Sequence, residues 1–185
     1  MTDRSAPSPS PEWANRPEGF RRVAALLATH GHPFAPQWLD TPARTCAQAA
    51  ALLGLQTGQI AKSVIFKRRA DALAVLVVAA GDMRVDEAKV AARVGAIGRA
   101  DAAFVKQQTG FSIGGVAPVG HQAVGHSQPP LVLIDQTLLR FAAVWAAAGH
   151  PNAVFCATPA QLVALTGAPV VDVVADPAAG FEAAA

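Results

Sequence analysis

Lys62 is the residue whose place in the sequence most clearly suggests chemistry. The segment 60–66 reads as a β-strand, and the two-residue period of a strand places Lys62 on one face with Ile60, Val64 and Phe66. An ammonium among apolar neighbours is costly unless an anionic or polar group meets it, so we expect Lys62 to bind a ligand. The alternative is a lysine on an edge strand that extends into water.

A glycine-rich segment over 109–121 is the second candidate. It contains the pair Gly114 and Gly115, followed by Pro118 and Gly120. Glycines followed by a proline of fixed φ define a turn and expose backbone N–H groups, which suit an oxyanion or a carboxyl ester. The alternative is an ordinary tight connection between two elements.

Several titratable residues have two interpretations each. His121 and His126 flank the glycine segment and could act as acid or base, or simply be solvated. Asp135 follows an apolar strand, where it could line a pocket or cap a turn. Basic side chains could form a surface that faces phosphate, or a solvated rim; they are Lys67, Arg68, Arg69, Arg84, Lys89, Arg93, Arg99 and Lys106.

The composition excludes other classes. The 185 residues are 52% hydrophobic and 15% charged, with a net charge of +2, so the chain should fold around a full core. Cys46 and Cys156 are far apart and have no metal-ligand spacing, so we expect neither a metal nor a cofactor. Nucleophile-elbow, Walker and dinucleotide-binding motifs are missing from the sequence. With neither a signal peptide nor an apolar run that could span a bilayer, we expect a soluble cytoplasmic protein.

The surrounding pattern indicates an α/β fold in one domain over 16–176, between flexible tails at 1–15 and 177–185. Residues 141–148 fit a helix or a strand. Strands that follow both hairpins and helices favour a mixed sheet. We expect helices over 17–30, 87–94, 102–108 and 158–165, with another from Thr41 or Thr45 to 53, and strands over 34–39, 60–66, 73–80, 131–134, 154–157 and 170–174.

The order and spacing of these motifs closely resemble the YbaK/EbsC family, relatives of the editing domain of bacterial prolyl-tRNA synthetase that include the freestanding ProX-type proteins. The resemblance runs from about Arg44 to Val174. The segments that carry it are Gln59–Phe66, Val78–Asp86, Thr109–Gly120, Asp135, Ala148–Gly149 and Thr166–Ala168.

The resemblance implies a single compact domain with a mixed, barrel-like sheet and surrounding helices, which hydrolyses the ester of a mischarged aminoacyl-tRNA in trans. The substrate would be a small amino acid on tRNA-Pro or a related tRNA. Lys62 falls on the family's essential lysine, and Gly114 and Gly115 fall in its substrate-clamping loop. Residues assigned to substrate binding are Ser63, Pro118, Gly120, His121 and Asp135.

The resemblance also implies partners. These are the aminoacyl-tRNA acceptor end and prolyl-tRNA synthetase, with no membrane. An alternative function is a non-catalytic module that binds a small ligand or a tRNA 3′ end in the same pocket. Sequence-specific DNA binding is disfavoured, because neither a basic recognition helix nor a helix-turn-helix pattern is present in the sequence.

Overall fold

The computed structural model describes residues 13–123 and 128–176. The predictions made for most of the N-terminal tail, for His126 and for the C-terminal tail at 177–185 fall outside these ranges. Trp13, which the sequence placed in the tail, packs edge-on against Phe20 with 5.7 Å between ring centroids. Trp13 therefore packs against the domain, because a tryptophan brings enough apolar surface to pack even beside prolines and serines.

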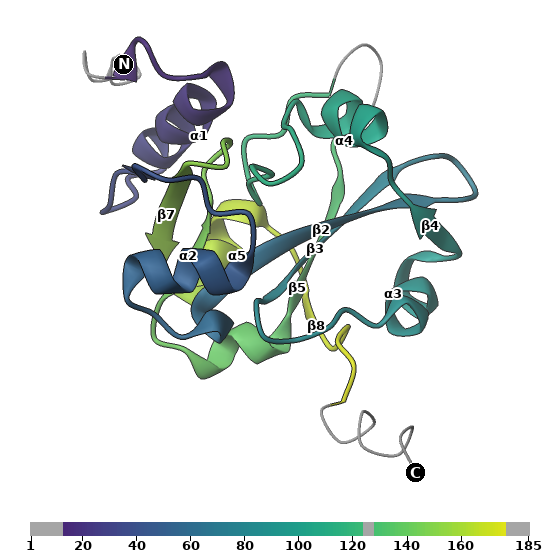
Figure 1. The fold of residues 1–185 in the computed structure, drawn as a ribbon. Coiled ribbons are helices and arrows are strands. Elements are labelled where there is room, and N and C mark those ends of the chain that lie inside the picture. The colour runs from purple at the N-terminus through teal and green to yellow at the C-terminus, as the bar shows by residue number, and fades with distance from the viewer. Residues whose placement is uncertain (1–12, 124–127, 177–185) are drawn as a thin grey trace, which may run out of the picture.

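The molecule is built on one mixed sheet with the strand order β1-β7-β6-β2-β3-β5-β8, and β4 pairs with β2 outside this order (Figure 1). The β2–β3 pair is antiparallel, whereas β3–β5, β5–β8 and β2–β6 are parallel. The expected single α/β domain with a mixed sheet is confirmed. The strands are β1 (Gln37–Trp38), β2 (Ile60–Arg68), β3 (Ala74–Ala80), β4 (Ile97–Arg99), β5 (Leu131–Asp135), β6 (Val144–Ala147), β7 (Ala153–Ala157) and β8 (Val170–Val171).

The strand β3 is an interior strand of the sheet, as its unbroken apolar run predicts. All seven of its residues are buried. Leu76 and Val78 belong to the core cluster that the helices over 18–29, 102–109 and 159–166 cover. Val75 and Val77 belong to a second cluster closed by the helix over 87–94 and the chain around Val173. Burial on both faces explains why this strand has no polar alternation.

Five α-helices of the described residues surround the sheet, and capping residues visible in the sequence set most of their starts. Thr45, Asp86, Asp101 and Thr158 each accept a hydrogen bond from the first turn of the following helix. Pro17 is the N-cap of the first helix rather than a first-turn residue. The helices are α1 (Glu18–Thr29), α2 (Cys46–Leu53), α3 (Glu87–Val94), α4 (Ala102–Thr109) and α5 (Pro159–Thr166).

Four strands differ clearly from the sequence prediction. The strand expected over 34–39 is only the two-residue β1. The ambiguous segment contains the strand β6, which pairs with β7 and with the start of β2. The strand β4 was not predicted, because three residues with a central glycine carry almost no strand signal. The last strand stops at Val171, and Val174 instead forms an isolated bridge with Val85.

One edge of β2 is open in its middle. On one side β2 pairs with β3 from Ala61 to Lys67. On the other side it pairs with β6 only at Ile60 and Ala61, and with β4 only from Phe66 to Arg68. The segment 62–65 therefore has no strand partner on this side within the described residues. This gap positions the candidate site.

Candidate active site

Lys62 lies at this gap. The strand β2 is interior to the sheet, but its segment 62–65 is unpaired on this side within the described residues, so Lys62 lies at a local edge. The side chain is half-buried, and its ammonium donates a hydrogen bond to the backbone carbonyl of Met83 in the turn after β3. An ammonium has three donors, so two remain for a ligand. Two cavities adjoin this residue.

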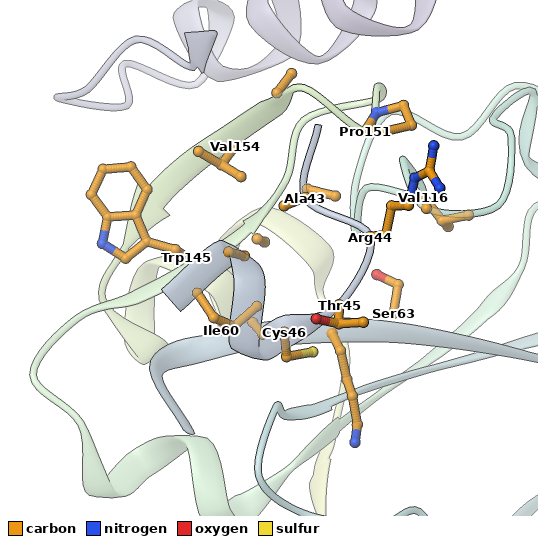
Figure 2. Close-up of a pocket in the computed structure, with 17 residues that line it drawn as sticks. Ala43, Arg44, Thr45, Cys46, Ile60, Ser63, Val116, Trp145, Pro151 and Val154 are labelled. Carbon is orange, nitrogen blue, oxygen red and sulfur yellow. The ribbon is translucent and has the colours of Figure 1, made fainter. Parts of the chain in front are cut away.

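The first cavity, which we call the Trp145 pocket, has a volume of about 210 Å³. Its wall is mostly apolar, because β6 and β7 contribute alanines, Trp145 and Val154, while β2 contributes Ile60 (Figure 2). Its polar lining comes chiefly from Lys62 and Ser63 on β2 and from the residues Arg44, Thr45 and Cys46 around the start of α2. A pocket of this kind accepts a small, largely apolar group beside a few fixed polar contacts.

Ser63 is the most informative polar residue of the Trp145 pocket. In Figure 2 its side chain rises from β2 toward the side where Arg44 and Val116 lie. Its hydroxyl is buried and has no hydrogen-bond partner in the described residues. A buried hydroxyl without a partner is costly, and one that lines a cavity is explained by a ligand.

We therefore expect Ser63→Ala to separate stability from activity. Removing the unpaired hydroxyl should leave the melting temperature unchanged or raise it, because no hydrogen bond of the protein is lost. The kcat/KM for the substrate should fall by about two- to tenfold, the worth of one hydrogen bond. Thermal denaturation measures the first quantity, and kinetics of the deacylation that the resemblance implies measure the second. A variant with lower stability and unchanged kcat/KM would show that the hydroxyl serves the fold instead.

The glycine segment reaches the Trp145 pocket through Gly114 and Val116. Residues 112–115 form a turn in which the Gly115 N–H donates to the Ser112 carbonyl over 3.0 Å. Gly114 occupies the third position with φ of +90°, which only glycine adopts without strain, and it lines the Trp145 pocket. The expectation of exposed amides needs a correction at Gly115, because its N–H is already bonded within the turn.

Gly115 is required for close packing. A Cβ atom at this position would lie 2.7–2.9 Å from the backbone of His150. The neighbouring Pro151 lines the Trp145 pocket and is the nearest group to Gly114. Gly115 therefore holds the turn against the pocket wall formed by the chain between β6 and β7.

The second half of the glycine segment faces α1 instead of the pocket. Pro118 is buried, and the Gly120 carbonyl accepts a 2.6 Å hydrogen bond from Arg22 on α1. His121 donates through Nε2 to the Ala117 carbonyl and packs edge-on against Phe111. None of Pro118, Gly120 and His121 lines either cavity. The hydrogen bond between Arg22 and Gly120 could not be predicted from local sequence patterns, because the two residues lie 98 positions apart.

His121 should act on stability and not on catalysis. Burial lowers the pKa of His121, with the charge of Arg22 acting in the same direction. The unfolded chain thus binds this proton at a higher pH than the folded chain, so stability falls as the pH drops below about 6.5. We expect His121→Gln to flatten part of the dependence of melting temperature on pH between 7 and 5 and to retain deacylation. The exposed His30 provides the control variant, His30→Gln. Parallel profiles for wild type and His121→Gln would contradict this role.

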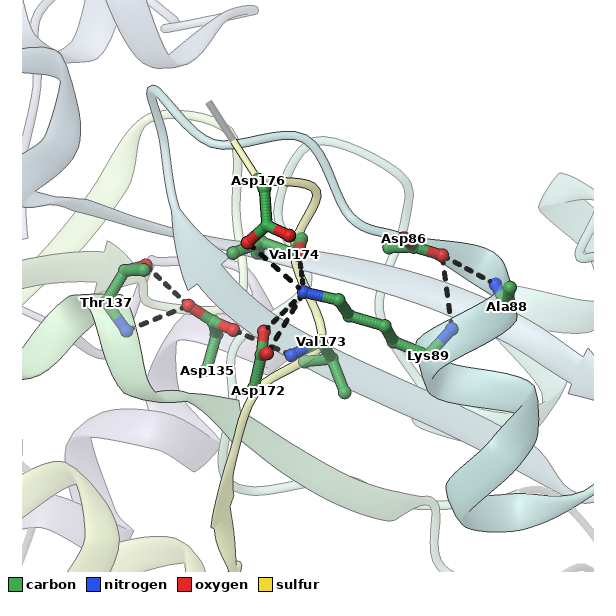
Figure 3. A network of polar contacts seen from close by, with 9 residues as sticks. All are labelled: Asp86, Ala88, Lys89, Asp135, Thr137, Asp172, Val173, Val174 and Asp176. Carbon is green, nitrogen blue, oxygen red and sulfur yellow. Dashed lines mark hydrogen bonds and ion pairs between the residues drawn. The ribbon is translucent and has the colours of Figure 1, made fainter. Parts of the chain in front are cut away.

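Asp135 has partners that fix a structural role. Its side chain is fully buried, and one carboxylate oxygen accepts hydrogen bonds from the backbone and hydroxyl of Thr137, while the other accepts from the Val173 N–H over 3.0 Å (Figure 3). Asp135 lines neither cavity. The turn-capping interpretation describes this geometry, and the residue joins the end of β5 to the chain after β8.

Cys46 lines the Trp145 pocket, which the sequence did not indicate. Both cysteines are free and half-buried rather than fully buried. Burial raises the pKa of the Cys46 thiol, although the charge of Lys62 opposes this shift. The thiol is therefore protonated at neutral pH and is a poor nucleophile.

Sequence reasoning missed the pocket walls. Arg44, Trp145 and Pro151 line the Trp145 pocket, but they lie in segments with no motif of their own. Trp145 lies in the segment left open between helix and strand. A clear strand signal at 144–147 would have located it, yet Val-Trp-Ala-Ala carries none.

The second cavity, which we call the Arg84 cleft, has a volume of about 610 Å³. It lies between β2, the turn after β3 and the end of β4, with Arg84 and Arg99 among its lining residues. Lys62 lines both the Trp145 pocket and the Arg84 cleft. The site thus consists of a small apolar pocket and a larger, charged cleft that share a lysine.

The chain belongs to the aminoacyl-tRNA editing domain family, because the model of that family matches residues 40–165, more than half of the chain. This confirms the resemblance to YbaK-type proteins. None of the described helices has the length and apolar character needed to cross a bilayer.

Individual relatives agree with this family. The chain is 37% identical over 124 residues to YwhH, an uncharacterized protein of Bacillus subtilis (strain 168), which covers 66% of this chain and 75% of YwhH. The crystal structure of a proposed trans-editing enzyme for prolyl-tRNA synthetase has 38% identity and a TM-score of 0.77, covering 86% of this chain and 99% of that chain. The crystal structure of the hypothetical protein APE2540 has 31% identity and a TM-score of 0.75, and the match covers 83% of this chain and 99% of that chain.

Proposed function

We propose that this protein is a cytoplasmic aminoacyl-tRNA deacylase, which hydrolyses the ester of a small amino acid mischarged on tRNA-Pro or a related tRNA. The observation that carries the proposal is the position of Lys62 between the Trp145 pocket and the Arg84 cleft. An aminoacyl ester has the same two parts, since a small side chain lies on one side of the ester and a charged nucleotide on the other.

The chemistry needs no nucleophile from the protein. Water attacks the acyl carbon, the bond from that carbon to the ribose oxygen breaks, and the ribose oxygen takes up a proton. The free hydroxyl of the terminal ribose helps to orient the water. Lys62 supplies charge-assisted hydrogen bonds to the developing negative charge. The Gly114 N–H has no partner among the described residues and belongs to a residue that lines the Trp145 pocket, so it is the amide assigned to the carbonyl oxygen.

Editing of this kind has a physical reason. A synthetase pocket separates small side chains by only about 1–3 kcal/mol, so a second hydrolytic site improves accuracy. The proposed partners are the acceptor end of the tRNA and prolyl-tRNA synthetase, in line with the proposed role of the 38% identical structure.

A panel of aminoacyl-tRNAs tests the proposal. Purified protein is incubated with tRNA-Pro carrying alanine, cysteine, serine, threonine or proline, and the release of labelled amino acid is followed. We expect release of at least one small noncognate amino acid and little release of proline. Tight binding of every tRNA with no release above the spontaneous rate would establish the binding-module alternative and end the deacylase proposal.

A further inference from the structure

The Arg84 cleft contains two arginines whose side chains have no polar partner among residues 13–123 and 128–176. Arg84 is in the turn after β3 and Arg99 ends β4, and both side chains are exposed. Neither has a hydrogen bond or an ion pair to another side chain within the described residues. Two guanidinium groups from separate elements thus line one cavity of about 610 Å³.

Most other cations near this part of the sheet are already engaged. Arg68 forms an ion pair with Asp71, and the Arg69 guanidinium donates to the Ile97 carbonyl over 3.0 Å. Lys67 lies over the ring of Phe104. Residues 67–69 line neither cavity, which favours the interpretation of this cluster as a rim.

Lys89 is also engaged, and in Figure 3 it lies between Asp172 and Asp176. It is therefore not available to a phosphate. Among the basic residues considered in the sequence, Arg84 and Arg99 combine a free guanidinium with a place in a cavity that Lys62 shares.

The acidic residues of the Arg84 cleft do not cancel this charge. Asp82 is paired with Arg140, which lies outside the cleft lining. Glu87 occupies the first turn of α3, where the helix dipole favours a carboxylate. With Lys62 at one end, the cleft has three cations against two acids, one of which is neutralised from outside.

We propose that the Arg84 cleft is the nucleotide half of the site and that Arg84 and Arg99 bind a backbone phosphate of the tRNA acceptor end. This inference rests on the proposed function. Guanidinium groups suit phosphate because their planar donors match its oxygens in pairs. The apolar walls from Val64, Met83 and Val85 offer a surface for a ribose or a base. The aminoacyl group then extends past Lys62 into the Trp145 pocket.

The proposal predicts an effect on binding rather than on the chemical step. Phosphate contacts are the same in the ground state and the transition state, so losing them raises KM and leaves kcat unchanged. Each phosphate of a single strand that is no longer neutralised also reduces the slope of log affinity against log salt by about 0.7.

The experiment compares wild type with Arg84→Gln, Arg99→Gln and the double variant. The probe is an uncharged RNA hairpin with the acceptor stem and a CCA end, and affinity is measured by fluorescence anisotropy across a salt series. For the double variant we expect an affinity at least about tenfold lower and a salt slope smaller by about 0.7, because the two arginines bind the same phosphate. Arg93→Gln is the matched control, because Arg93 is exposed on α3 and lines neither cavity.

The outcomes separate this inference from the proposed function. An unchanged affinity and slope in the double variant would overturn the phosphate site, even if wild type deacylates aminoacyl-tRNA. A wild type that deacylates nothing, with a double variant that loses hairpin binding, would overturn the deacylase and keep the site. A parallel titration with 5′-AMP distinguishes a free nucleotide, and binding of 5′-AMP as tight as that of the hairpin would contradict the assignment to the acceptor end.

Discussion

Replacing Lys62 by methionine should lower the single-turnover rate of deacylation by about 100- to 1,000-fold, the typical effect of removing one donor from a site that stabilises developing negative charge. Methionine keeps an unbranched apolar stem but has no donor. The half-buried side chain loses only its hydrogen bond to the Met83 carbonyl, so the fold should persist.

The matched control for this variant is Lys67→Met on the same strand. Lys67 lies over Phe104 and lines neither cavity, so its loss should leave the chemical step unchanged. Circular dichroism and melting temperature verify folding in both variants. A Lys62→Met rate within a few-fold of wild type would remove Lys62 from the mechanism.

The second large effect is expected for Gly115→Ala. A Cβ atom would lie 2.7–2.9 Å from the His150 backbone, and backbone cannot move aside as a flexible side chain can. The added methyl group should destabilise the protein by about 1–3 kcal/mol through overpacking. It should also displace the turn that carries Gly114, and a shift of about 1 Å at a reacting centre costs about 100-fold in rate.

Activity per folded molecule distinguishes the two effects of Gly115→Ala. The assay is run well below the melting temperature of the variant, where the folded fraction is known. Gly98→Ala is the control, because a Cβ atom there has no neighbour closer than 3.6 Å. A Gly115→Ala protein that is less stable but fully active when folded would show that the glycine serves packing alone.

Much of the fold could be predicted because local signals agree with the tertiary structure. The bounds of α3 match because Asp86 caps its start and Gly95 follows its last residue. The run over 73–80 predicts a strand covered on both faces, and β3 is buried throughout. By contrast, the glycine in β4 and the short segment around Trp145 carry no periodic signal, so their pairing with β2 depends on contacts that a local pattern does not encode.

The sequence could predict a residue of the candidate site only where the type and spacing of that residue alone suggested a ligand contact. Lys62 and Gly114 are found at a cavity, as the strand period and the glycine pair indicated. Aspartate and histidine are residue types that often act in catalysis, but here both side chains form hydrogen bonds inside the fold. Asp135 accepts from the Val173 N–H, and His121 donates to the Ala117 carbonyl. The sequence could not reveal the unpaired hydroxyl of Ser63 or the unpaired arginines of the Arg84 cleft. A group is known to be unpaired only when the positions of all its possible partners in the described residues are known.

The most direct test of the account is the single-turnover release of a small noncognate amino acid from mischarged tRNA-Pro, with protein in excess. The account predicts a release rate well above spontaneous hydrolysis for wild type, a rate close to spontaneous for Lys62→Met, and little release of proline from the same tRNA. Release by wild type at the spontaneous rate for every amino acid tested, with folding verified, would contradict it.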